Sequence, residues 1–325
     1  MNTSSSRTSR RQFAALTTAA MAATLCPLPA LPGETPVRKR LMRLTLSPGA
    51  IGVKANPRET LALAHQYGFE AIEPNANFLT DLSDADLAAF RAEMQARNIV
   101  FGSAGLAVNF RQDDAKFRTS LEALPKIAAG LQRAGVTRVG TWISPTHAEL
   151  AYADNLRQHA TRLREAAKVL RDHGQRLGLE YVGTPSIRQN RPNPFIYSLR
   201  QMQELIAEIG TGNVGVVLDS WHWWTAGETE ADLLKLTNAD VVSVDLNDAP
   251  AGIPLPEQQD GKRELPCATG VIPVKTFLGA LQRISYDGPV RAEPFNKPLN
   301  AMDKDAACAA TIAALKKAAA LITDN

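Results

Sequence analysis

Acidic residues end a series of short apolar segments in this 325-residue sequence. They are Glu73, Glu180, Asp219, Asp245 and Glu293. A single acid in such a position usually caps a helix or lies in a surface turn. Five carboxylates that converge would repel one another, so they require a divalent cation, a neighbouring Arg or Lys, or raised pKa values. Because the set is rich in oxygen and contains no thiol, it favours one hard divalent ion such as Mn²⁺ or Mg²⁺.

Aromatic side chains accompany these acids. His222 follows Asp219 by three positions, within a run of tryptophans where an ordinary core histidine is uncommon. All four tryptophans fall at or just after the end of an apolar segment: Trp142, Trp221, Trp223 and Trp224. Sugars stack their apolar C–H faces on indole rings, so the combination indicates a carbohydrate ligand. A hydrophobic patch that forms a homodimer is the alternative interpretation.

Eight β-rich segments position these residues. The predicted strands are Leu41–Leu46, Phe69–Pro74, Ile99–Ser103, Arg138–Trp142, Leu179–Gly183, Val214–Asp219, Val241–Leu246 and Val290–Glu293. Helical patterns separate them, most clearly in residues 83–98, 113–134 and 154–177. Parallel strands need crossover connections, so the alternation predicts a single α/β domain, a (β/α)₈ TIM barrel. A doubly wound open sheet is the alternative, but the Gly-rich phosphate loop that usually follows its first strand is missing.

The longest irregular segment is residues 247–271, after the seventh predicted strand. A loop of this length in a compact domain is usually functional, and in a barrel it lies on the catalytic face. We therefore expect it to contribute to the site.

The first 30 residues resemble a targeting segment. Arg10 and Arg11 precede Phe13 and the apolar run 14–25, which is too short to span a bilayer. This layout is typical of a twin-arginine export signal; a basic tail or a membrane anchor is the alternative. The sequence thus predicts a signal peptide at 1–30, a linker at 31–40 and the barrel at 41–325. The protein would be periplasmic or secreted, exported already folded by the twin-arginine machinery, with no stable membrane span after processing.

The charge balance excludes one class of partner. The whole chain has 36 Lys and Arg against 33 Asp and Glu, a formal charge of +3. Three arginines and no acid lie in residues 1–30, so the exported chain would carry no net charge. A neutral protein gives no electrostatic case for binding nucleic acid. A small-molecule ligand is the expected partner.

The arrangement of these motifs resembles the xylose-isomerase-like sugar phosphate isomerase/epimerase superfamily, from about Leu41 to the C-terminus. The residues that carry the resemblance are Glu180, Asp219, His222, the segment Val244-Asp245-Leu246-Asn247-Asp248-Ala249-Pro250, and Glu293 before Pro294-Phe295. Many epimerase relatives have His where this chain has Asp245, which would make the ligand set four carboxylates.

The resemblance implies particular roles. One divalent metal, Mn²⁺ first and Mg²⁺, Co²⁺ or Zn²⁺ as options, would be held by four acids: Glu180, Asp219, Asp245 and Glu293. His222 and Arg263 would hold substrate hydroxyls. We expect Glu73, Trp142 and Trp221 to complete the substrate contacts.

The chemistry expected from this family is isomerisation or epimerisation of a ketose or related polyol through an enediolate. Glu180 and Glu293 would be the catalytic acid–base pair, one removing the proton and the other returning it. Two other classes stay open: a lyase that eliminates the leaving group of a keto-glycoside, and a non-catalytic sugar-binding barrel.

Overall fold

The computed structural model describes residues 40–323. Its strands all pair in parallel, in the order β3-β2-β1-β9-β8-β7-β6-β5-β4. They are β1 (Arg43–Leu46), β2 (Ala71–Ile72), β3 (Val100–Phe101), β4 (Ala104–Gly105), β5 (Arg138–Trp142), β6 (Arg176–Glu180), β7 (Val214–Asp219), β8 (Val241–Leu246) and β9 (Pro289–Ala292).

The two ends of this strand order belong to one stretch of chain. β3 pairs with β2, and β4 pairs with β5, but only Gly102 and Ser103 separate β3 from β4. The third predicted strand, Ile99–Ser103, contains β3 and ends just before β4. The two halves of this bent segment bond to different neighbours and close the ring. A Cβ at Gly102 would lie 3.0 Å from the Cγ2 atom of Thr45, so the bend allows a close approach that glycine accommodates. The predicted (β/α)₈ barrel is confirmed.

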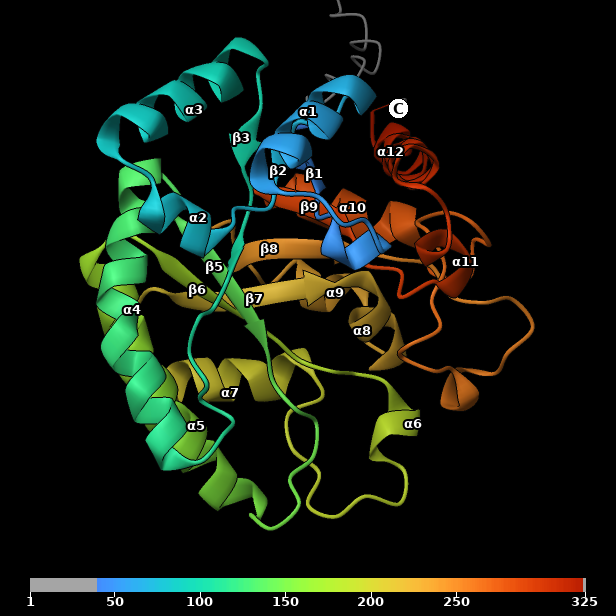
Figure 1. The fold of residues 1–325 in the computed structure, drawn as a ribbon. Coiled ribbons are helices and arrows are strands. Elements are labelled where there is room, and N and C mark those ends of the chain that lie inside the picture. The colour runs from blue at the N-terminus through green and yellow to red at the C-terminus, as the bar shows by residue number, and fades with distance from the viewer. Residues whose placement is uncertain (1–39, 324–325) are drawn as a thin grey trace, which may run out of the picture. The chain divides into compact units, whose positions relative to one another are not determined.

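Helices surround the strands, as Figure 1 shows. The longer ones are α1 (Pro57–Tyr67), α3 (Asp84–Ala96), α4 (Asp114–Ala134), α5 (Tyr152–Asp172), α7 (Leu199–Ile209), α10 (Val274–Arg283) and α12 (Lys304–Ala320). The shorter ones are α2 (Ala76–Asp81), α6 (Pro185–Arg188), α8 (Ser220–Thr225), α9 (Glu230–Leu233), α11 (Lys297–Asn300), η1 (Gly49–Ile51) and η2 (Leu255–Glu257). None of the described helices is both long enough and apolar enough to cross a membrane.

The predicted junction between one helix and the strand that follows it was wrong. The helix expected over 154–177 ends at Asp172, and the next strand begins at Arg176, three residues before the predicted start. Gly174 adopts a left-handed φ of 71° and turns the chain after the helix. The turn was not predicted, because Leu177 continues the helical spacing of apolar residues beyond it. Leu177 instead belongs to β6 and is buried in the apolar core. Ser83 caps the start of α3, since its hydroxyl accepts the N–H of Asp86.

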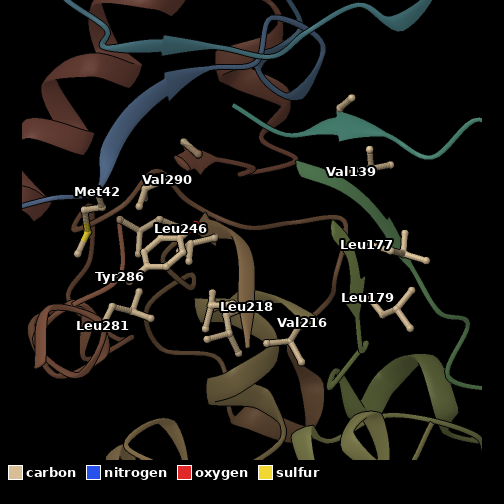
Figure 2. Close-up of a cluster of buried hydrophobic side chains, with 14 of the residues drawn as sticks. Met42, Val139, Leu177, Leu179, Val216, Leu218, Leu246, Leu281, Tyr286 and Val290 are labelled. Atoms are coloured by element: carbon tan, nitrogen blue, oxygen red, sulfur yellow. The ribbon is translucent and has the colours of Figure 1, made fainter. Parts of the chain in front are cut away.

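The apolar core lies between the sheet and the helices. Figure 2 shows Leu177 and Leu179 of β6 and Leu281 of α10 among its buried side chains. Because side chains alternate along a strand, the leucines of β6 face the core and leave Glu180 on the opposite, inner face. This alternation is what aims the strand-end acids into the barrel mouth.

Small residues line the inside of the barrel below these acids. Gly140 pairs with Gly178, and Gly178 pairs with Gly215, which places a row of glycines across β5, β6 and β7. A Cβ at Gly178 would lie 2.8 Å from side-chain atoms of Val217 and of Val242. The glycines therefore let these valines fill the interior and form the floor beneath the site.

Candidate metal and substrate site

Strand register brings the acids together. Asp219 of β7 is paired with Asp245 of β8, which is paired in turn with Arg291 of β9. Glu180 ends β6, and Glu293 follows the last residue of β9. Oxygen atoms of the four acids all lie within 4.8 Å of one another. The structure thus gathers the four predicted metal ligands into one cluster, while leaving their roles as predictions.

Asp219 is fully buried and accepts three strong hydrogen bonds. Its Oδ1 accepts from the backbone N–H of Trp221 at 2.7 Å and from Nδ2 of Asn247 at 2.9 Å. Its Oδ2 accepts from Nη1 of Arg263 at 2.7 Å. Burial raises the pKa of Asp219 to about 6, although the Arg263 charge opposes that shift. Asn247 also fixes β9, because its Oδ1 accepts the N–H of Glu293 at 3.0 Å.

Arg263 comes from the long loop and is 1 % exposed. Besides Asp219, it pairs with Asp260 at 2.8 Å and with Glu293 at 3.5 Å. Its guanidinium also lies 5.3 Å from the ring centroid of Trp221. The long loop thus places Arg263 against the acidic cluster, and its role in a functional site stays a prediction. Asp260 was missed, because a loop acid without a strand pattern gives no signal of its position.

His222 lies beside this arginine and is buried. Its Nε2 is 3.2 Å from Nη2 of Arg263, and its Nδ1 accepts the backbone N–H of Gly183 at 3.2 Å. Burial, with the arginine charge in support, lowers the pKa of His222 to about 3. The imidazole is therefore neutral at physiological pH.

Arg291 is the second cation of the cluster, and the sequence analysis missed it. Its Nε and Nη2 donate to the two oxygens of Asp245 at 2.5 and 3.0 Å, and Nη2 also donates to Glu293 at 3.0 Å. Oε2 of Glu73 lies 3.8 Å from Nη1 of Arg291. The signal was present: residues i and i+2 of a strand face the same side, so an inward Glu293 implies an inward Arg291.

The pKa values of both candidate catalytic acids are raised. Burial raises the pKa of Glu180 well above its ordinary value, and the charge of Glu293 adds to this. Burial raises the pKa of Glu293 to about 7, against the opposing charge of Arg291. Among the described residues, none offers a hydrogen bond to the buried Oε1 of Glu180.

These features fit a divalent cation. When ionised, the four carboxylates outnumber Arg263 and Arg291, and a divalent ion would offset the negative charge that remains. The unpartnered oxygen of Glu180 is a free ligand atom. Glu180, Asp219 and His222 form a second possible ligand group, also within 4.8 Å.

A cavity of about 260 Å³ opens above the cluster. It is lined by five residues of the predicted site: Glu73, Trp142, Glu180, Asp245 and Glu293. The other four lie buried beside it: Asp219, Trp221, His222 and Arg263. Of the four tryptophans only Trp142 reaches the cavity, and it is 46 % exposed. The expected aromatic rim is therefore a single indole, because Trp221 turns inward on α8 and bonds to Thr184.

Glu73 lines the wall of the same cavity. It accepts a hydrogen bond from the hydroxyl of Ser47, the residue after β1. The four-acid cluster does not include it, and its substrate contact stays a prediction.

Comparisons with known proteins agree on the family. A family model described as xylose isomerase-like TIM barrel matches residues 61–318. An inosose isomerase of Bacillus velezensis is 22 % identical over 259 residues, covering 78 % of this chain and 89 % of the relative. An inosose isomerase of Bacillus subtilis is 26 % identical over 133 residues, which span 41 % of this chain and 45 % of that protein.

Solved structures give the same fold. A xylose isomerase domain protein of Alicyclobacillus acidocaldarius is 32 % identical with a TM-score of 0.75, covering 86 % of this chain and 99 % of the other. The IOLI protein with a binding zinc atom has a TM-score of 0.70 at 21 % identity, covering 87 % and 98 %. A D-psicose 3-epimerase crystallised in the presence of D-fructose has a TM-score of 0.65 at 17 % identity, covering 87 % and 100 %.

Proposed function

Because this chain belongs to the xylose isomerase-like TIM barrel family, we propose that it is a divalent-metal-dependent sugar isomerase or epimerase. One observation carries the proposal. Four acids have oxygens within 4.8 Å of one another: Glu180, Asp219, Asp245 and Glu293. Two of them, Glu180 and Glu293, have raised pKa values and line the central cavity. The inosose isomerase and sugar 3-epimerase relatives support the same reaction class.

The four acids would hold the ion, and Mn²⁺ is our first candidate because every ligand is an oxygen. When bound, the ion supplies Lewis acidity to a carbonyl and a neighbouring hydroxyl of the substrate. Zinc in the IOLI structure supports a divalent metal without fixing its identity here.

Glu180 and Glu293 would move the proton of the enediolate reaction. They come from β6 and from the end of β9, which lie on different sides of β7 and β8 in the sheet order. One can therefore remove a proton from the carbon next to the carbonyl while the other returns it. Their raised pKa values suit these roles: the pKa of Glu293, about 7, lets it exchange a proton near neutral pH, and the raised pKa of Glu180 favours its protonated form.

The remaining residues would hold the substrate. Trp142 offers an exposed indole face to a sugar ring, and Glu73 offers a hydroxyl acceptor on the cavity wall. Arg263, His222 and Trp221 are buried in a layer behind the acids, so any contact they make with substrate hydroxyls requires a ligand seated deep against the cluster.

A lyase is the second candidate, and one observation favours it. A larger hollow of about 780 Å³ adjoins the central cavity and shares Glu73 and Gly105 with it. Its polar lining includes Lys54, Asn75 and Asn77. This hollow has room for the leaving group of a keto-glycoside, which elimination through the same enediolate would release.

The deciding experiment incubates metal-loaded protein in D₂O with ketoses and keto-glycosides and follows the mixture by NMR. Deuterium exchange with a new stereocentre or a shifted carbonyl supports the isomerase or epimerase, and release of an aglycone supports the lyase. Tight binding of a sugar without any exchange would identify a non-catalytic binding barrel and overturn the proposal.

Export by the twin-arginine route is also a proposal, because residues 1–39 lie outside the described part of the chain. Changing both Arg10 and Arg11 to Lys should retain the protein in the cytoplasm with its barrel intact. Fractionation of cells that express the tagged protein checks this, and unchanged export would exclude the route.

A further inference from the structure

One arginine on the wall of the central cavity has no counter-charge among residues 40–323. Arg111 lies between β4 and α4 and lines the same cavity as the acids. Its guanidinium carbon lies 4.3 Å from the ring centroid of Trp142 and 4.6 Å from that of Phe110. Nη1 donates to the carbonyl oxygen of Trp142 and, at 3.3 Å, to the hydroxyl of Thr141. The group is thus held in place by two rings and a backbone carbonyl.

The opposite edge of this guanidinium is unused. Neither Nε nor Nη2 of Arg111 donates a hydrogen bond to a residue in the range 40–323, and no acid in that range forms an ion pair with it. Nε and Nη2 carry the parallel pair of N–H bonds that binds a carboxylate side-on. Glu73 lies on the same cavity wall, but it is engaged by Ser47 and lies 3.8 Å from Arg291.

The three arginines of the site differ in their electrostatics. Despite burial, nearby carboxylates raise the pKa of Arg263 and of Arg291. For Arg111, shielding from water lowers the pKa, and no carboxylate offsets it. A cation that is partly desolvated without a partner is unfavourable in the free protein, and an anion that arrives with the ligand relieves that cost.

We propose that Arg111 binds a carboxylate carried by the substrate, so that the enzyme acts on an acidic sugar such as a hexuronate or a keto-aldonate. This inference rests on the proposed function, because it assumes that the sugar ring lies over the four-acid cluster. A cavity of about 260 Å³ is below the roughly 300–1,000 Å³ of sites for drug-sized ligands and is suited to one monosaccharide. Trp142 then contacts the C–H face of the sugar next to the bound carboxylate.

A neutral hydroxyl is the weaker partner for this edge. It would accept one hydrogen bond and leave the charge of Arg111 uncompensated, whereas a carboxylate accepts two and cancels it. A phosphate shares this chemistry, so the test must separate the two anions.

The test measures binding to the full, Mn²⁺-loaded protein by isothermal titration calorimetry. The probes are D-glucose, D-glucuronate and D-glucose 6-phosphate, with D-galactose and D-galacturonate as a second matched pair. Each hexuronate should bind at least 10-fold more tightly than its hexose. Arg111→Gln should bring that ratio close to one, while Arg111→Lys should keep part of it, because lysine retains the charge but not the fork. Arg157→Gln removes a surface charge on α5 and should keep the full ratio.

Several outcomes would overturn the inference: no preference for the hexuronates, a preference that survives in Arg111→Gln, or a preference for the 6-phosphate alone. Elemental analysis and D₂O exchange on the same preparations test the proposed function separately from the carboxylate assignment. If neutral ketoses still exchange and the metal is bound, only the carboxylate assignment has failed.

Discussion

Replacing Arg263 by Met should destabilise the metal-free protein severely. The guanidinium is 1 % exposed and pairs with Asp219 at 2.7 Å, Asp260 at 2.8 Å and Glu293 at 3.5 Å. Methionine has a similar length and an apolar side chain, so it fills much of the space beneath Trp221 but leaves these carboxylates without their cation. Removing one partner of a buried ion pair costs about 3–5 kcal/mol, and we expect a loss in this range at pH 8.

The loss should shrink as the pH falls. Without Arg263 the acids lose a charge that lowers their pKa values, so they take up protons more readily than in the wild type. A protonated acid needs no counter-charge, so the variant should recover part of its stability at pH 5.

Urea unfolding followed by circular dichroism, in the presence of a chelator, measures this effect. Arg157→Met is the matched control, because its ion pair with Asp154 is exposed and its loss should cost no more than about 0.5 kcal/mol. Combining Arg263→Met with Asp219→Asn should cost clearly less than the sum of the single changes. A loss below about 1 kcal/mol, or equal losses at pH 5 and pH 8, would refute the account of Arg263 as the cation that balances the acids.

Three further predictions test the site and its surroundings. Protein purified with Mn²⁺ should hold about one ion per chain by elemental analysis, and Asp219→Asn should lose it; retention of metal by that variant would remove Asp219 from the ligand set. Glu180→Gln and Glu293→Gln should each lower turnover by about 10²–10⁴-fold and should combine non-additively, whereas near-normal turnover in either would place the chemistry elsewhere. Away from the cavity, burial raises the pKa of Glu228 to about 7 from 4.5, so the folded protein keeps a proton that the unfolded chain releases. Stability should therefore fall by up to about 3 kcal/mol as the pH rises from 4.5 to 7, and Glu228→Gln should lack this component in urea titrations; identical pH profiles would contradict the shift.

The sequence was sufficient for the fold because each strand–helix unit carries its own periodic signal. Its errors arose where two signals overlap. Leu177 continued the apolar period of α5, so the turn at Gly174 was overlooked and β6 was placed three residues late. The break between β3 and β4 depends on which neighbours each half bonds to, and no local pattern records that pairing.

The acids of the site could be found from the sequence because they end apolar strands, where a carboxylate is unexpected. Arg291 was missed because an arginine within a β-rich segment gives no distinct signal of a site, although it lies two residues before Glu293 and so faces the same side of the strand. The depth of Trp221 was also unpredictable: the position suggested a rim residue, but the first turn of α8 carries the indole into the core. Burial of this kind depends on packing from distant segments, here Thr184 and the long loop.

The long loop that supplies Arg263 also determines whether a protease can reach the backbone next to the charge cluster. Lys262 is exposed and Arg263 is buried, so a sequence that trypsin prefers lies at the surface with one of its two basic side chains locked among acids. Trypsin can engage Arg263 only when the loop leaves the barrel, and that opening takes a positive charge away from the carboxylates beneath. Local opening requires less free energy than global unfolding, so cleavage after Arg263, unlike cleavage after the exposed Lys262, would report the disassembly of the acidic cluster while the sheet is still folded.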